Sequence, residues 1–342
     1  MKKAAAADKK STSAATNIST AGPLKKTPGG WQRSSVTERT LTTLRRDGFL
    51  PAQEKMPTRA PGDEVEPRPE ANERVCFVDF VQRGFALPVH EFLRGLMYTY
   101  GIQLHDFTPN SILHIACFII LCECFLGLRP HWGLWQRIFN VKRNSGANGV
   151  YPVGGFGIQT RADVEYFDLK QLDSAQNWRK KWFYVTDVHI GGQQYGLPPY
   201  RAGAVVKRKR SWVHRPDTRE YSESTPLLSR VSDLLKTAGK EVSGVHLIAT
   251  FIRRRVHPIQ ARVHPLFEYD GAADATRVSS EELPADEVEA RVCQITVLKA
   301  GEGGSLELPV QPFSSDNPAP PVSASFSCRY CASCLGRVLL RF

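Results

Sequence analysis

The densest group of chemically active side chains in this sequence is a basic run made of Lys207, Arg208, Lys209 and Arg210. Trp212 follows two positions later. Clustered ammonium and guanidinium groups bind phosphates, and an indole ring can stack on a nucleic-acid base. The same composition is typical of a nuclear import signal. The run is therefore compatible with a nucleic-acid contact, with an import signal, or with a solvated basic loop.

The positive charge of the chain is concentrated in two segments. The formal net charge is +11 over 342 residues. Residues 1–33 hold seven basic residues and one acidic residue, and residues 201–215 hold six basic residues and no acidic one. The remainder of the chain is close to neutral. Any partner with many phosphates, such as nucleic acid, is expected to bind these segments rather than the folded core.

The cysteine and histidine patterns do not predict a metal centre. Cys328, Cys331 and Cys334 form one C-x-x-C-x-x-C run, but a structural zinc site needs four ligands and no histidine follows. His257 and His264 each lie in a Val-His-Pro triplet, and two histidines do not complete a site. Eight cysteines in a chain this long, without a secretory signal, also do not indicate a disulfide framework.

Enzyme signatures are absent from the sequence. Gly154, Gly155 and Gly157 miss the spacing of a phosphate-binding loop and predict the start of a strand. A metal-dependent nuclease needs several acids around two metals, and such acids can be dispersed along a chain. Reverse transcriptase and aspartic protease motifs do not occur. We predict no catalytic residue, no cofactor and no small-molecule substrate.

The element that must organise the fold is an apolar stretch from Ile112 to Leu128. It carries His114 and Glu123 and is shorter than a membrane span of about 20 residues. Thr108 and Pro109 supply a helix start, and the following residues are apolar on nearly all sides. We therefore predict a central core helix over residues 109–127 and no membrane span. Three of its residues should be buried: Ile115, Ile119 and Leu126.

Further helices are predicted around it. We predict that residues 73–141 form a helical unit. In this unit one helix has an apolar face from Val89 to Tyr100, and another starts at Pro130. Ser35 and Glu38 have capping-box spacing, and Thr225-Pro226 should open a late helix. A last helix should contain residues 245–252. The proline-rich residues 51–72 read as a linker.

Aromatic and β-branched runs at residues 150–161, 164–169 and 182–190 predict strands. The expected fold is therefore α+β and predominantly helical: a helical bundle plus a small antiparallel sheet, with disordered termini. We place a disordered basic tail at residues 1–30 and one domain at residues 31–270. Residues 271–342 are acidic and then Ser/Pro-rich, and we predict them to be mostly disordered.

The sequence resembles a plant family, the gypsy-type transposon domain of retrotransposon-derived proteins, over residues 31–296. The resemblance is carried by several motifs in a fixed order: Trp31, Ser34, Leu41, Leu44 and Gly48; Arg83-Gly84-Phe85 with Pro88; Thr108-Pro109-Asn110-Ser111; Cys122-Glu123; Leu126-Gly127; Pro130 with Leu134-Trp135; Trp178 with Trp182-Phe183-Tyr184-Val185; and Phe251, Arg254, Arg255, Pro258, Gln260 and Arg262. It implies a protein encoded by, or decayed from, a plant retroelement, and it assigns no catalytic residue.

These observations lead to one expectation and two rivals. We expect a non-enzymatic, retrotransposon-derived protein with a Gag-like role, including self-association. The first rival is a nuclear protein that binds nucleic acid through residues 201–215. The second is a metal-dependent nuclease of transposase type. Because no secretory signal is recognisable, the protein is expected inside the cell, in the nucleus or the cytoplasm.

Overall fold

The computed structural model describes residues 31–54, 56–87, 89–144, 153–173, 175–187, 196–202, 212, 214–236, 242–254 and 283–301. The basic run at 207–210, both Val-His-Pro histidines, the three C-terminal cysteines and the predicted disordered tail at residues 1–30 lie outside these ranges. The main elements are α1 (Glu38–Arg46), β1 (Thr58–Arg59), β2 (Glu73–Phe77), α2 (Val78–Gln82), α3 (Glu91–Tyr100), α4 (Pro109–Ile120), α5 (Trp132–Ile138), β3 (Phe139–Arg143), β4 (Phe156–Thr160), β5 (Trp182–Thr186), α6 (Thr218–Lys236), α7 (Gly244–Arg254) and α8 (Ala285–Ile295).

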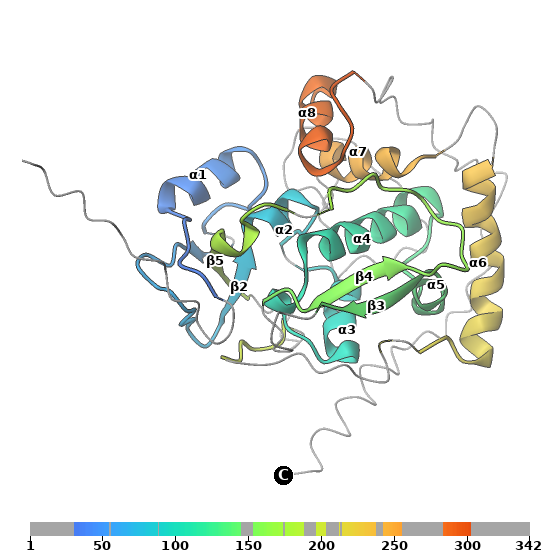
Figure 1. Cartoon of the computed structure of the whole chain (residues 1–342), viewed down its shortest axis with the longest axis horizontal. Coiled ribbons are helices and arrows are strands. Elements are labelled where there is room, and N and C mark those ends of the chain that lie inside the picture. The colour runs from blue at the N-terminus through green and yellow to red at the C-terminus, as the bar shows by residue number, and fades with distance from the viewer. Residues whose placement is uncertain are drawn as a thin grey trace, which may run out of the picture.

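Helix α4 lies in the middle of the molecule (Figure 1). Thr108 is its N-cap and accepts a hydrogen bond from the Ser111 N–H, and Pro109 occupies the first turn. The helix continues into a π-helical turn, Leu121–Phe125, and the chain turns away at Gly127, whose φ is +65°. The predicted central helix is confirmed, because Ile115, Ile119 and Leu126 are all buried.

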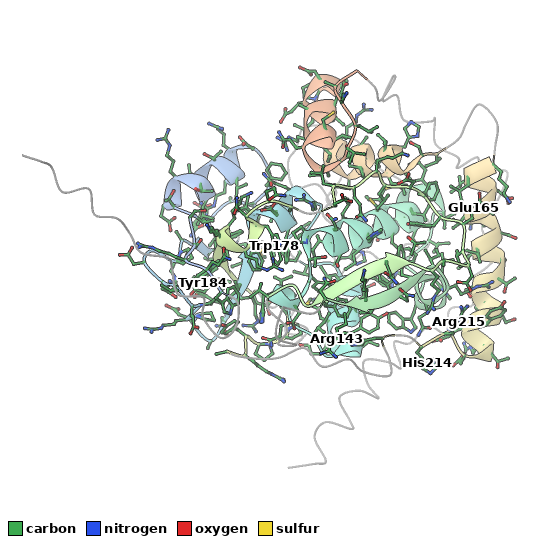
Figure 2. The ribbon with its side chains drawn as sticks, in the orientation of Figure 1. Arg143, Glu165, Trp178, Tyr184, His214 and Arg215 are labelled. Carbon is green, nitrogen blue, oxygen red and sulfur yellow. The ribbon has the colours of Figure 1, made fainter. Side chains whose placement is uncertain are left out.

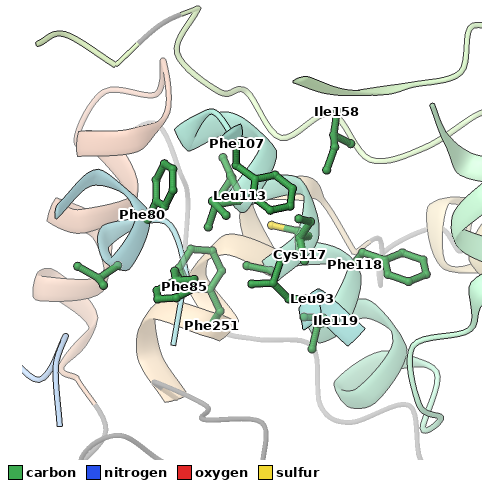
Figure 3. Packing of buried hydrophobic residues seen from close by; sticks show 14 of the residues in the cluster. Phe80, Phe85, Leu93, Phe107, Leu113, Cys117, Phe118, Ile119, Ile158 and Phe251 are labelled. Carbon is green, nitrogen blue, oxygen red and sulfur yellow. The ribbon is translucent and has the colours of Figure 1, made fainter. Parts of the chain in front are cut away.

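Other elements cover α4 on several sides. Helices α2 and α7 and strand β4 pack against it. Figure 3 shows side chains from these elements meeting on its surface, including Phe80 of α2 and Phe251 of α7. Helix α3 buries Leu93, Leu96 and Met97, as its apolar spacing predicts. The buried side chains form one continuous hydrophobic cluster that extends from Trp31 to Ile295.

The strands in the described part of the chain form two small antiparallel sheets rather than one. The first has the order β1-β5-β2, with Val75 opposite Tyr184. The second pairs β3 with β4, with Val141 opposite Ile158. The α+β class, predominantly helical with small antiparallel sheets, is confirmed. Among the described residues, no helix is long and apolar enough to cross a membrane.

Four local predictions are wrong. Residues 73–77 form strand β2 and not part of the helical unit, because β5 supplies a ladder partner. The linker at 51–72 contains the edge strand β1, and residues 164–169 form no strand. Thr37 caps α1 in place of Ser35, whose hydroxyl donates to the Lys180 carbonyl oxygen at 2.9 Å.

The C-terminal part of the fold also differs from the prediction. Helix α6 begins at Thr218 and contains Pro226 in its interior, so Pro226 does not mark the start of a helix. Helix α8 lies within residues 271–342 and packs against α7 (Figure 1). Its apolar residues Val288, Val292 and Ile295 are buried. The acidic composition suggested a disordered tail, but acids on one side of a helix leave its other side free to pack. The folded part therefore extends beyond residue 270, to include α8.

Glycine at position 84 is required by a close contact, and this generates a stability prediction. Gly84 has φ +91°, and an added Cβ would lie 2.5 Å from Ala116 Cβ of α4. Gly62 has φ +65° with nothing within 4 Å of the added Cβ. Gly62→Ala should lower the free energy of unfolding by about 1–2 kcal/mol through backbone strain alone. Gly84→Ala should lower it by about 2–5 kcal/mol, because overpacking is added.

Chemical denaturation measures both values. Gly95→Ala is the control, with an expected change in stability of the opposite sign. Gly95 is exposed in the interior of α3, and an added Cβ would have nothing within 4 Å. It should raise stability by about 0.5–1 kcal/mol. Equal losses for the Gly84 and Gly62 variants would show that α2 does not approach α4 as closely as described.

Candidate nucleic-acid interface

Both flanks of the basic run are attached to the same corner of the fold. The Arg201 N–H donates to Gln103 Oε1 at 2.6 Å, and Trp212 Nε1 donates to the Tyr100 carbonyl oxygen at 3.2 Å. Tyr100 ends α3, and Gln103 follows three residues later. We call residues 100–106 the α3 corner. Arg201 and Trp212, which flank the basic run, are therefore both held at this corner.

The α3 corner is a rigid turn. Helix α3 ends at Gly101 in the left-handed conformation, with φ +62°, and the Ile102 N–H bonds the Met97 carbonyl oxygen at 3.0 Å. Such a glycine cap satisfies the last carbonyls of a helix. The Gln103 N–H then donates to Asp106 Oδ2 at 2.8 Å. The Gln103 backbone is therefore held in place while its side chain accepts the Arg201 bond.

Trp212 is an anchor and not a stacking platform. Its side chain is 1% exposed, and its ring meets Phe156 of β4 edge-on with a centroid distance of 5.0 Å. The sequence suggested that this indole could stack on a base. That interpretation is wrong for the described conformation, because the ring faces are covered by protein. Its role is to fix the chain immediately after the basic run.

Two further cations lie on the strand beside this anchor. Lys142 and Arg143 are exposed at the end of β3, and Arg143 pairs with Phe156 in the β3–β4 ladder. Since Phe156 contacts Trp212, these cations belong to the surroundings of the α3 corner. Figure 2 shows Arg143 at the lower edge of the molecule in that view, where His214 and Arg215 are also labelled. The sequence contained these residues, but their position follows only from the strand pairing.

The residues that follow Trp212 are tied to the loop after β4. Arg215 pairs with Asp163 Oδ2 at 2.7 Å, and this hydrogen bond lowers the pKa of the Asp163 carboxyl. Arg161 donates from Nη2 to the His214 carbonyl oxygen at 3.2 Å and from Nε to the Gln136 carbonyl oxygen at 2.8 Å. The basic segment 201–215 is thus attached to the α3 corner at both flanks and to the β4 loop at its end.

A buried histidine and a buried carboxyl support the corner from inside. The His105 ring lies 5.3 Å from the Trp31 ring and 5.4 Å from the Tyr200 ring. Burial lowers the pKa of His105 to about 4, so the imidazole is neutral at physiological pH. Burial also raises the pKa of Asp106 to about 7, although the Gln103 N–H bond acts in the opposite direction. Asp106 therefore changes its charge near neutral pH.

The other residues considered from the sequence have structural roles. Gly154 donates its N–H to the His105 carbonyl oxygen at 3.0 Å just before β4, as expected for the start of a strand. Glu123 of the central helix accepts from His90 Nε2 at 2.9 Å, with both side chains buried. No local pattern in the sequence predicts this pairing. Within the described ranges, no group of three or more metal-ligating side chains occurs.

Residues 75–143 match the family model described as "Putative gypsy type transposon". The matched stretch runs from β2 to the end of β3 and includes the central helix. It is shorter than the resemblance over residues 31–296. No curated protein matches the chain, and no solved structure does. The match confirms the gypsy-type resemblance and supports a retrotransposon-derived protein.

The titration of Asp106 should make stability depend on pH. Its pKa is about 7 in the folded protein and about 4 in an unfolded chain. Folding is therefore favoured while Asp106 is protonated. This contribution to the free energy of unfolding is fully present below about pH 4 and is lost as the pH rises to 7. Asp106→Asn removes this dependence. The free energy of unfolding of the variant, relative to wild type, should rise by a few kcal/mol between about pH 4 and 7 and stay constant above.

Urea unfolding at a series of pH values measures this difference. Subtracting the wild-type curve cancels the contributions of groups that do not contact Asp106. His105 is not among them, because its Nε2 lies 3.8 Å from Asp106 Oδ1. Asp173→Asn, at an exposed position, is the control and should give a flat difference. Parallel curves for Asp106→Asn and wild type would mean that Asp106 is ionised across the whole range.

Proposed function

We propose that this retrotransposon-derived protein is non-enzymatic and has a Gag-like role, in which residues 201–215 bind the phosphate backbone of nucleic acid. The observation that carries the proposal is the attachment of both flanks of the basic run to the α3 corner. A segment held at both ends has less conformational freedom to lose when it binds. Lys142 and Arg143, exposed at the end of β3, add two cations close to these anchors.

Such binding would not depend on base sequence. Lysine and arginine contacts to phosphate position a protein on nucleic acid but carry no direct sequence information. Because most of the chain outside the two basic segments is close to neutral, long-range attraction would come from those segments. The gypsy-type match supports a retrotransposon origin, and the Gag-like role with self-association is our proposal for a protein of that origin. We place this activity in the nucleus or the cytoplasm.

Salt dependence of binding tests this proposal. The affinity of the full-length protein for duplex DNA should fall steeply between about 50 and 200 mM salt, with a log–log slope of about −0.9 per phosphate contact. Replacing Lys207, Arg208, Lys209 and Arg210 by Ala should weaken binding and make the slope shallower. Residues 1–33 still contribute in that variant, so removing residues 1–30 as well should abolish most of the remaining affinity.

The matched control removes the same number of charges elsewhere. Arg39, Arg46, Arg68 and Lys180 are exposed and lie in other parts of the chain. Their combined replacement by Ala should leave the slope nearly unchanged. Equal losses for both quadruple variants would mean that net charge, and not residues 201–215, determines binding. Cleavage of DNA that requires Mg²⁺ or Mn²⁺ and survives repurification would contradict the non-enzymatic role and favour a nuclease.

A further inference from the structure

The two basic segments of the chain join the fold at one aromatic cluster. Trp31, the first described residue, follows the basic residues 1–30, and Tyr200 precedes Arg201 at the start of the second segment. The Trp31 and Tyr200 rings lie 6.2 Å apart, and the His105 ring lies 5.3 Å from the first and 5.4 Å from the second. The Trp31 side chain is also a hydrogen-bond partner of the Tyr200 hydroxyl. We call Trp31, His105 and Tyr200 the junction cluster.

Strands β2 and β5 hold the N-terminal side of the junction cluster. Trp31 is 5% exposed, and its ring stacks on that of Phe77 of β2 with a centroid distance of 6.1 Å. Trp182 Nε1 of β5 donates to the Gln32 carbonyl oxygen at 2.7 Å, and the Ser34 hydroxyl donates to the Trp182 carbonyl oxygen at 2.5 Å. The point from which the N-terminal basic segment extends is therefore fixed on the fold.

Helix α3 and the end of β5 hold the other side of the junction cluster. Tyr98 Oη of α3 donates to the Gly196 carbonyl oxygen at 2.9 Å. The Leu197 N–H donates to Asp187 Oδ2, just after β5, at 2.6 Å. The Arg201 anchor at the α3 corner comes next in the chain. The start of the second basic segment is therefore fixed as firmly as that of the first.

The two basic segments start close together in space. A Trp or Tyr ring centre lies about 4 Å from its own Cα, so the Cα atoms of Trp31 and Tyr200 are at most about 15 Å apart. This distance corresponds to about four or five base pairs of duplex DNA, at about 3.4 Å per base pair. A duplex of about ten base pairs is roughly 34 Å long and can reach both starting points at once.

Two segments of like charge side by side favour a partner that carries many negative charges. Residues 1–33 hold seven basic residues and one acidic residue, and residues 201–215 hold six basic residues. Their starting points are separated by little more than a Debye length of about 8–10 Å, so salt screens their repulsion only in part. Asp63, which pairs with Arg33, and Glu66, beside the junction cluster, offset only part of this charge. A polyanion that contacts both segments relieves the repulsion.

We propose that one nucleic-acid molecule is held by residues 1–33 and residues 201–215 at the same time, with the junction cluster between them. This inference rests on the proposed function, because it assigns a second contact to the same nucleic-acid partner. Once one segment has bound, the other is present at a high effective concentration beside the same molecule. Affinity can then exceed that of either segment by about 10²–10⁴ without a new kind of contact.

Removal of one segment at a time tests this proposal. The probe is a fluorescein-labelled DNA duplex of about 12 base pairs; anisotropy gives the Kd, and calorimetry gives the number of duplexes bound per protein. The wild type should bind one duplex. Deletion of residues 1–30 and the quadruple alanine variant of residues 207–210 should each weaken binding at least tenfold and leave that number at one. The salt slope of the wild type should approach the sum of the slopes of the two variants.

A spacer tests whether the shared starting point matters. A flexible Gly/Ser spacer of about 40 residues, inserted between residue 30 and Trp31, keeps every charge but lowers the effective concentration of the N-terminal segment. It should weaken binding roughly fivefold to twentyfold. The same spacer after Gly301, which is exposed beyond α8, is the matched control and should leave the Kd unchanged. None of these changes replaces a side chain of the buried cluster, so all variants should melt as the wild type does.

Three results would overturn the inference and leave the proposed function in place. The first is binding of two duplexes by the wild type, with the Kd of each segment unchanged when the other is removed. The second is full affinity in the variant with the spacer before Trp31, because the position of the starting points would then have no effect. The third is equal weakening by both spacers. Absence of salt-sensitive duplex binding by the wild type would overturn the proposed function and this inference together.

Discussion

The structure depends on the burial of one helix that is apolar on every side. All residues of α4 from Ser111 to Ile120 are buried, so elements distant in sequence must cover it. Its polar groups then need partners inside the protein, because an unsatisfied buried group is costly. Ser111 Oγ accepts from the Ile158 N–H at 3.0 Å and donates to the Phe156 carbonyl oxygen at 3.2 Å. One hydroxyl on the central helix thereby fixes the position of strand β4.

The candidate interface follows from that bond. Because Ser111 fixes the position of β4, it also fixes the Phe156 ring that contacts Trp212. The β3–β4 ladder then places Arg143 opposite Phe156. The cations beside the α3 corner are therefore positioned by the core and not by one another. Repulsion between the neighbouring cations is offset by the apolar packing of Phe156 and Trp212, which does not depend on salt. Under the proposed function, attraction of these cations for phosphate would vary with ionic strength, whereas the packing that positions them would not.

The sequence predicted those features whose signal is local. The 3.6-residue spacing of apolar side chains predicted α3. A stretch that is apolar on nearly all sides, with Thr108 and Pro109 at its start, predicted α4. Strand β2 was mistaken for helix because its partner β5 lies more than 100 residues further on. Helix α8 was missed because its acidic composition concealed three buried apolar positions. The basic run was visible, but its anchors were not, since the Gln103–Arg201 bond joins residues 98 positions apart.

Two kinds of interaction with different range meet at this end of the molecule. If residues 201–215 bind phosphate as proposed, their charges act over a Debye length of about 8–10 Å and do not tell one base from another. The contacts that hold the flanks of the segment act only at short range, through the Gln103 amide, the Trp212 indole and the Arg161 guanidinium. Two of these three bonds join uncharged groups, and all three are shielded by the fold, so salt that weakens the proposed phosphate contacts leaves the attachment of the segment in place.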